Sequence, residues 1–459
     1  MSSWVVDILQ EIPDLLVSGD PSDLQHYGQD WTRQWPPNPC LVAFPSDYTQ
    51  VQALVRFANQ RCVALVPSGG RTGLSGGAVA TNGEIVVSLS RLNRILDFDE
   101  ADRVLTVQAG VVTEVVQNEA TARSLYYPVD FGSRGSSQIG GNVATNAGGI
   151  KVLRYGMTRD WVAGMKVVTG TGELLELNRN LVKNATGYDF RHLMIGSEGT
   201  LGIIVEVSLR LAPQPPAQQV MLLAVAGREA LMPVLAGLRE RLELSAFEFF
   251  TDKALRHVLA AGARKPFESQ SSCYVLAEFD AVEGLAETVF SELADKALVT
   301  DGVIAQSSAQ AAELWRLREG ITESISRYTP YKNDISVRIS RIEPFMTEME
   351  ALFAREYPDF EVIWFGHLGD GNLHISILKP ESWKIDAFSR ECDRVTELLA
   401  DSLARYEGSI SAEHGVGLLK KPYLDCSRST PEIVLMRQIK HVFDPNGILN
   451  PGKLVDFNV

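Results

Sequence analysis

The chain has 459 residues, 45% hydrophobic and 22% charged, a composition that favours a soluble globular protein of two or three domains. Asp and Glu total 57 against 43 Lys and Arg, and the net charge of −14 argues against nucleic acid and anionic membrane surfaces as main partners. No apolar run of roughly 18 residues occurs, so no transmembrane helix is predicted, and the acidic N-terminus lacks the basic region of a signal peptide.

The chain has five cysteines, scattered, odd in number and without CxxC spacing: Cys40, Cys62, Cys273, Cys392 and Cys426. This usage is typical of a reducing compartment. We therefore expect reduced, buried thiols, a cytoplasmic protein and no catalytic cysteine.

Short strands alternate with helical segments over residues 41–212, which are also rich in glycine. TQVQALVRFANQ (residues 49–60) has the apolar spacing of an amphipathic helix. Strands are predicted at 62–70, 84–90, 103–111, 165–177 and 202–211. The proline-rich stretch APQPPAQQ after Leu211 predicts a domain boundary.

Three glycine-rich segments punctuate this first region: PSGGRTGLSGG (67–77), DFGSRGSSQIGGNVATNAGG (130–149) and IGSEGTLGII, which starts at Ile195. Glycine lets main-chain N–H groups approach a bound anion closely, as a pyrophosphate requires. None is a GxGxxG dinucleotide fingerprint or a phosphate loop of the GxxxxGK[ST] type. One such segment alone could be an ordinary surface turn, but three in one domain favour an anion-binding role.

Beyond residue 219 the chain interleaves longer helical patterns (REALMPVLAGLRERL, 228–242) with strands (CYVLAEF, 273–279). VIWFGH and LHISIL read as two strands joined by the hairpin loop LGDGN. A hairpin brings its flanking positions together, so His367 and His374 are expected to converge. Two such histidines could equally be a structural pair.

The turn SAEHGVG (411–417) supplies Glu413 and His414. Two histidines and one carboxylate with an open position are a recurring arrangement for catalytic zinc. The alternative for Glu413 and His414 is a solvated loop pair. Asp370, inside the hairpin loop, is expected to stabilise the turn rather than bind a metal.

ELWRLREGITESISRYTPYK (313–332) is predicted as one helix that ends at Pro330. Arg318 and Thr322 lie at i and i+4 along the border of its apolar stripe. Without further information, this is an ordinary amphipathic helix with a snorkelling arginine.

PSGGRTGLSGG, IGGNVATNAGG, GSEGTLGII and the terminal DPNGILNPGK together resemble the vanillyl-alcohol-oxidase type of flavoprotein, most closely its D-2-hydroxy-acid dehydrogenase branch. The resemblance runs from about residue 40 to 455. It implies an α+β fold: a FAD-binding domain of two α+β subdomains (1–212), a larger α+β substrate domain (213–400) and a helical C-terminal segment that returns to the flavin (401–459).

The resemblance also implies which residues hold FAD: Pro67, Gly69, Gly70, Arg71, Thr72, Gly73, Ser75, Ser137, Gly140, Gly141, Asn142, Thr145, Glu198, Gly199, Ile203 and Asn450. Some relatives tether the flavin through a histidine in or near the first loop. This sequence has no histidine between His26 and His192, so non-covalent FAD is expected.

In the second half, the resemblance implies that His367, His374 and Glu413 hold a divalent metal, for which these ligand types favour zinc, and that His414 is the general base. Oxidising a 2-hydroxy acid removes a hydride from C2, which the flavin takes at N5, and a proton from the hydroxyl. A bound metal makes that hydroxyl more acidic, and a neutral imidazole can accept the proton. Arg318, Thr322, Lys332, Ser376 and His414 are implied to contact the substrate.

D-2-hydroxyglutarate is the expected substrate, because Arg318 and Lys332 would otherwise be buried cations without a partner. The segment YGQDWTRQWPPNP (27–39) also resembles the hydroxyglutarate enzymes. D-lactate and D-malate remain alternatives, since Ser376 stands where that group commonly has asparagine.

Two other classes stay open: a flavin-dependent alcohol oxidase, and a flavin-binding protein without redox turnover. By family analogy the electron acceptor is an electron-transfer flavoprotein or a quinone. A homodimer is also left open by the sequence.

Overall fold

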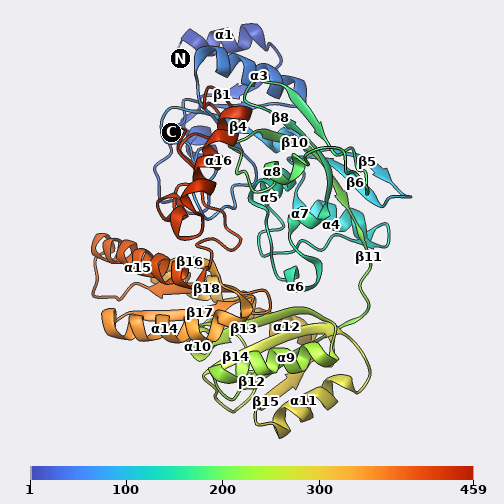
Figure 1. Ribbon diagram of the computed structural model, residues 1–459, viewed down its shortest axis with the longest axis vertical. Helices are drawn as coiled ribbons and strands as arrows, with labels where there is room; N and C mark the ends of the chain where they lie inside the picture. The colour runs from blue at the N-terminus through green and yellow to red at the C-terminus, as the bar shows by residue number, and fades with distance from the viewer. Residues whose placement is uncertain (1–2, 458–459) are drawn as a thin grey trace. The chain divides into compact units, whose positions relative to one another are not determined.

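The structure is a computed structural model that describes residues 3–457 (Figure 1). The chain forms two compact units. Unit 1 contains the chain up to Gly149, Gly156–Gln214 and the chain from Glu413 onward, and unit 2 contains Ile150–Tyr155 and Pro215–Ala412. The passage from Gln214 to Pro215 lies inside the proline-rich stretch.

The first sheet of unit 1 has four strands in the order β1-β2-β4-β3, where β2, β4 and β3 run parallel. Helix α3 (Tyr48–Arg61) connects β2 to β3, as the apolar spacing predicts, and begins at Asp47, whose carboxylate accepts the Gln50 N–H at 2.9 Å. The strands are β1 (Leu16–Ser18), β2 (Leu41–Phe44), β3 (Leu65–Ser68) and β4 (Ile85–Ser88), and the preceding helices are α1 (Ser3–Glu11) and α2 (Pro21–Tyr27).

The second sheet of unit 1 is antiparallel, in the order β5-β6-β10-β8-β9. Its strands are β5 (Ile95–Asp99), β6 (Val104–Gln108), β8 (Val162–Val168), β9 (Leu174–Leu177) and β10 (Ile203–Arg210). The helices around it are α4 (Thr113–Thr121), α5 (Ile139–Thr145), α7 (Thr158–Trp161) and α8 (Arg191–Met194), and β7 (Leu125–Tyr126) pairs with β11 (Ala212–Pro213). All five strands predicted in this region are confirmed, the longest as two strands.

The C-terminal segment of unit 1 includes α16 (Thr430–Phe443) and a turn held by a buried ion pair. Lys440 Nζ contacts Asp444 Oδ2 at 2.5 Å and donates to the Leu449 carbonyl at 2.6 Å. The turn brings Leu449 beside Leu65 of β3. Asn450 is thereby fixed beside the start of β3, the strand that leads into the first glycine-rich segment.

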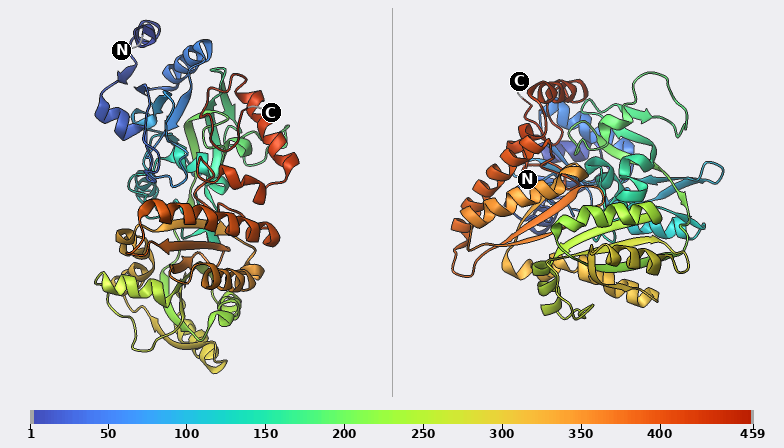
Figure 2. Two further views of the ribbon diagram at one scale, coloured as in Figure 1. Left: turned by 90° about the vertical axis from the view of Figure 1, so that its left-hand side faces the viewer. Right: turned by 60° about the horizontal axis from the view of Figure 1, so that its bottom comes forward.

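Unit 2 is built on a seven-stranded antiparallel sheet in the order β15-β12-β14-β13-β17-β18-β16. Its strands are β12 (Gln218–Val225), β13 (Leu244–Thr251), β14 (Cys273–Asp280), β15 (Val299–Ile304), β16 (Tyr331–Ser336), β17 (Glu361–Gly366) and β18 (Asn372–Leu378). Its helices are α6 (Val152–Tyr155), α9 (Leu231–Arg241), α10 (Asp252–Ala260), α11 (Leu285–Asp295), α12 (Ser308–Glu319), α13 (Ile321–Ser324), α14 (Ile342–Glu356) and α15 (Ile385–Tyr406). Helix α15 runs beside β16 (Figures 1 and 2), where the Tyr331 and Thr396 hydroxyls lie 2.6 Å apart.

The histidine hairpin is confirmed: β17 pairs with β18 from Glu361↔Leu378 to Phe365↔His374. The single helix predicted over 313–332 is wrong. Helix α12 ends at Glu319, the short helix α13 follows Gly320, and Tyr331 already lies in β16. Glycine is a weak helix former, which is consistent with the break at Gly320. Pro330 cannot continue a helix, and the residues after it pair in the sheet as β16.

The expectation that the thiols are buried holds for Cys273 and Cys392 only. Cys62 is exposed, because it ends α3 in the left-handed conformation with φ 51°, and Cys40 and Cys426 are half-buried. Within residues 3–457, no helix is both long and apolar enough to cross a membrane.

Candidate active site

The first and second glycine-rich segments contact each other directly after β3. A Cβ at Gly70 would collide with the Ser136 carbonyl and lie 2.9 Å from the Ser137 Cα, so only glycine allows this approach. A Cβ at Gly69 would lie 3.4 Å from Gln138 Oε1. The backbone of both segments therefore lines one small region of unit 1.

Four buried side-chain atoms in the glycine-rich segments and the C-terminal turn have no hydrogen-bond partner among the described residues: Ser68 Oγ, Gln138 Oε1, Ser197 Oγ and Asn450 Oδ1. Each unpaired buried polar atom is unfavourable by about 1–3 kcal/mol. They lie at the end of β3, in the second and third glycine-rich segments and in the C-terminal turn. A ligand with many polar atoms, such as FAD, fits this set.

The predicted flavin residues differ in what their side chains do. Arg71 has φ 58°, and its guanidinium contacts His26 Nε2 at 2.8 Å and stacks over Tyr27. Ser137 and Asn142 both contact the hydroxyl of Thr113, at 2.7 and 2.6 Å. These three side chains therefore hold the segments in shape through contacts within the protein.

Glu198 connects the third glycine-rich segment to the C-terminal part of the chain. It is buried with φ 51°, and its carboxylate accepts the N–H groups of Val416 at 2.7 Å and Gly417 at 2.8 Å. Burial raises its pKa. Asn450 Nδ2 donates to the Glu198 carbonyl at 2.7 Å. The turn that follows Glu413 and His414 is thus anchored to the third glycine-rich segment.

The N-terminal segment YGQDWTRQWPPNP packs against the first glycine-rich segment at Gly76. Asp30 is buried, and its Oδ2 accepts the Gly76 N–H at 2.8 Å. A Cβ at Gly76 would lie 2.7 Å from the Trp35 ring. This role of Asp30 could not be read from the sequence, because its partner lies 46 residues away.

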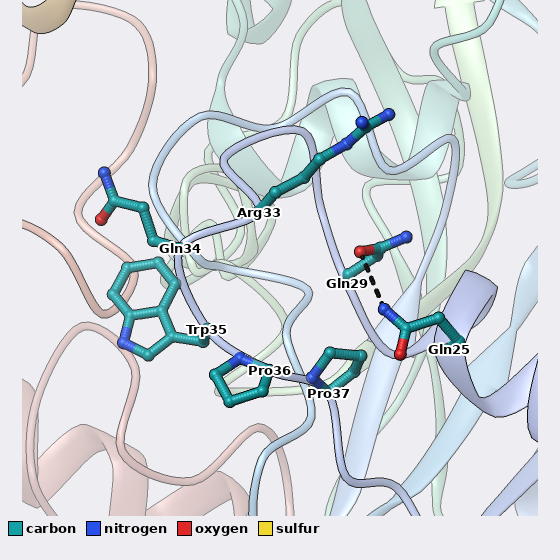
Figure 3. A pocket seen from close by; sticks show the side chains of 7 residues that line it. All are labelled: Gln25, Gln29, Arg33, Gln34, Trp35, Pro36 and Pro37. Atoms are coloured by element: carbon teal, nitrogen blue, oxygen red, sulfur yellow. Dashed lines mark hydrogen bonds between the residues drawn. The ribbon is translucent and has the colours of Figure 1, made fainter. Parts of the chain in front are cut away.

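An open depression of about 630 Å³ lies beside the same segment (Figure 3). It is lined by Gln25, Gln29, Arg33, Gln34, Trp35, Pro36 and Pro37. Figure 3 shows the Gln25–Gln29 hydrogen bond, which is 3.4 Å long. None of these side chains is buried, and none is a predicted site residue, so the chemistry lies elsewhere.

Polar residues form a row on one face of the unit 2 sheet. Residues paired directly across antiparallel strands point to the same face. The pairs are Lys332↔Ser376, Asp334↔His374 and Phe365↔His374. The strands β16, β18 and β17 therefore present a lysine, an aspartate, a serine and a histidine together in a largely apolar face.

The row continues through a buried carboxylate that the sequence reasoning missed. Glu248 of β13 is 1% exposed, and its Oε1 lies 2.8 Å from His367 Nδ1. Its Oε2 lies 2.8 Å from Arg318 Nη2 of α12. Burial opposes ionisation of Glu248, but the neighbouring His367 and Arg318 outweigh it, so the pKa is lowered.

Arg318 therefore has a partner, which corrects the expectation that it lacks one. The contact is an ion pair outside hydrogen-bond alignment, because Arg318 Nε and Nη2 donate no hydrogen bond to any described residue. The guanidinium lies over the Phe365 ring at 5.0 Å. Lys332 has no carboxylate within salt-bridge distance in the described chain, and burial lowers its pKa. Thr322 is exposed, beyond the break at Gly320.

Four residues could hold a metal ion: Asp334, His374, Glu413 and His414 each offer one ligand atom, and these atoms lie within 4.8 Å of one another. Glu413 directly follows Ala412, and the Ser409–Ser336 backbone pairing fixes the chain there beside β16. Oxygen and imidazole ligands suit zinc and other divalent ions.

His367 is not in that group, although its ring centroid lies 5.3 Å from that of His374. Asp334 was missed by the sequence reasoning. A charged residue at an apolar-face position of a strand, as in YKNDIS, was the available signal. Asp370 accepts the Asn372 N–H at 3.2 Å, which confirms its turn-stabilising role.

Comparison with known proteins places these two units in a class. The description "FAD binding domain" matches residues 39–178, and "FAD linked oxidases, C-terminal domain" matches residues 214–454. The solved 4-ethylphenol oxidase of Gulosibacter chungangensis, at 16% identity, superimposes with a TM-score of 0.76 over 99% of this chain and 97% of its own. The fold is that of a vanillyl-alcohol-oxidase type flavoprotein, and the chain is an FAD-dependent oxidoreductase.

The chain belongs to the FAD-linked oxidase family. Two similar relatives are both named D-2-hydroxyglutarate dehydrogenase. That of Xanthomonas citri pv. viticola is 60% identical and covers 98% of this chain and 97% of its own. That of Stutzerimonas stutzeri is 53% identical, over 97% of this chain and 98% of its own.

Proposed function

We propose that this protein oxidises D-2-hydroxyglutarate to 2-oxoglutarate, with FAD held non-covalently and a divalent metal, zinc by preference, held by His367, His374 and Glu413. The proposal draws its substrate from the names of the two relatives. The observation that carries it here is Arg318, whose buried Nε and Nη2 donate no hydrogen bond to a described residue. Buried donors without an acceptor are unfavourable, and the distal carboxylate of a dicarboxylate substrate supplies one.

Bound FAD supplies the acceptor for the two electrons and the C2 hydrogen, and the metal supplies positive charge that makes the hydroxyl more acidic. His367, His374 and Glu413 are the proposed ligands, and Asp334 is a further candidate from the four-residue cluster. These residues fix the hydroxyl and the adjacent carboxylate of the substrate in one orientation.

His414 accepts the hydroxyl proton at Nε2, which lies 3.7 Å from Glu413 Oε1 and so beside a proposed ligand. A neutral imidazole can take up a proton from the hydroxyl. His414 also belongs to the four-residue cluster, so a ligand role is the competing assignment. The two roles make different predictions for metal content.

The distal carboxylate is bound by Arg318 and Lys332, and Ser376, which pairs with Lys332 across the sheet, is a further substrate contact. Arg318 Nε and Nη2 are buried donors without a hydrogen bond among the described residues, so they are available to a ligand. Burial disfavours the charged form of Lys332, and a carboxylate beside it would offset that effect. Thr322 stays a proposed contact, although it is exposed.

Arg318→Ala should lower kcat/KM for D-2-hydroxyglutarate and D-malate by at least about 30-fold, since a charge-assisted hydrogen bond contributes about 2 kcal/mol. D-lactate lacks the distal carboxylate and should lose much less. Comparing diacid with monoacid in the same variant cancels any general damage caused by leaving Glu248 without its partner. Equal losses for all three acids would mean that Arg318 does not bind the distal carboxylate.

FAD should be released when the purified protein is denatured with acid, because residues 27–191, which include the first glycine-rich segment, contain no histidine to tether it. The measurement is flavin absorbance in the supernatant after precipitation of the polypeptide. Flavin that stays with the precipitate would contradict this and favour the alcohol-oxidase alternative.

Steady-state rates with the D- and L-forms of these acids, with and without a chelator, test the activity as a whole. We further propose an electron-transfer flavoprotein or a quinone as the acceptor, and a cytoplasmic location. The scattered cysteines, odd in number and without CxxC spacing, are compatible with that location.

A further inference from the structure

Glu248 uses both carboxylate oxygens, one on each of two functional side chains. Oε1 lies 2.8 Å from His367 Nδ1, and Oε2 lies 2.8 Å from Arg318 Nη2. The carboxylate is 1% exposed, so neither contact is screened by solvent. We infer that Glu248 is a positioning residue that links the metal site to recognition of the substrate's distal carboxylate, an inference that rests on the proposed function.

The contact with His367 fixes which ring nitrogen can bind a metal. A carboxylate accepts hydrogen bonds and donates none, so His367 carries its proton on Nδ1 and presents the lone pair of Nε2. Metal-binding histidines commonly have such a carboxylate on the second nitrogen, and it raises their basicity as ligands. The T-shaped packing of the His367 ring against His374 holds the ring plane as well.

The contact with Arg318 allows a guanidinium to remain charged inside the unit. Arg318 is 6% exposed, and an isolated buried cation is strongly unfavourable. Because Oε2 is close but outside hydrogen-bond alignment, Glu248 supplies charge without using the directed N–H bonds. Nε and Nη2 therefore remain available for a second carboxylate.

A purely structural ion pair is the competing explanation, and the same sheet face contains one for comparison. Glu278 of β14 is also buried, pairs with Lys151, and accepts from Ser245 Oγ at 2.5 Å and Trp315 Nε1 at 3.1 Å. It has no contact with a proposed ligand of the metal or substrate in the described chain. Glu278→Gln is thus a matched control for Glu248→Gln.

The experiment measures two quantities on each FAD-loaded variant. The first is zinc affinity, by competition with a chromophoric chelator. The second is the ratio of kcat/KM for D-2-hydroxyglutarate to that for D-lactate. In Glu248→Gln the amide oxygen can still accept a hydrogen bond from His367 or Arg318. The substitution removes the negative charge beside Arg318 and turns the amide N–H₂ group toward the other of these two residues.

We expect Glu248→Gln to weaken zinc binding by about 10-fold or more and to lower the substrate ratio, while Glu278→Gln changes neither by more than about twofold. Unchanged zinc affinity and ratio in Glu248→Gln would overturn the inference. A change in zinc affinity with an unchanged ratio would overturn the link, because Glu248 would then serve the metal alone.

Two arms keep the result interpretable. If Glu248→Gln does not fold, the Glu248→Gln/Arg318→Met double variant, which leaves no unpaired charge, supplies the zinc measurement. If the wild type does not oxidise D-2-hydroxyglutarate, the proposed function fails, yet the zinc affinities still decide whether Glu248 positions His367.

Discussion

Replacing His374 with alanine should remove the bound metal and nearly all turnover while the protein stays yellow. His374 is 9% exposed on β18, and its ligand atom lies within 4.8 Å of those of Asp334, Glu413 and His414. A small apolar side chain cannot replace an imidazole ligand. The flavin segments belong to unit 1 and do not include this residue, so FAD should remain. Metal content, flavin absorbance and turnover measured on one preparation check the result.

His257→Ala is a suitable control, because His257 of α10 is another partly buried histidine of unit 2 that lies 3.1 Å from a carboxylate, Glu361. It should keep both metal and turnover. Near-normal turnover of His374→Ala after dialysis against a chelator would mean that the hairpin histidines are structural.

His414→Gln should keep the metal and lower kcat by about 10²-fold or more, the usual effect of removing a general base. Glutamine retains a polar side chain of similar size but cannot take up a proton near neutral pH. Metal analysis decides between the two roles of His414. Loss of metal together with turnover would assign His414 as a ligand, and a loss of turnover smaller than about tenfold would remove it from the mechanism.

Much of the fold follows from local patterns. The period-2 runs and the 3.6-residue spacing of α3 correctly predict the strands and the helix of the first region. The spacing of apolar residues along the local sequence is enough to show which face of each element is buried. The single helix expected up to Pro330 is wrong, because its apolar spacing continues past Gly320 while the chain breaks there into α12 and the short helix α13.

The site was partly predictable. His367 and His374 stand out because they flank a predicted hairpin loop, and Glu413 and His414 because they lie in a glycine-framed turn. Glu248 and Asp334 do not, because their significance depends on register. Glu248 lies 119 residues from His367 in the sequence, and nothing local indicates that contact. Likewise, the charge of Arg318 looks unpaired until β13 is placed beside α12.

Anaerobic mixing of the purified protein with D-2-hydroxyglutarate, followed through the visible absorbance of the flavin, tests the central claim most directly. The account predicts that the flavin is bleached, that prior treatment with a chelator abolishes or greatly slows the bleaching, and that added zinc restores it. A flavin spectrum unchanged by D-2-hydroxyglutarate in the metal-loaded protein would contradict the proposed activity.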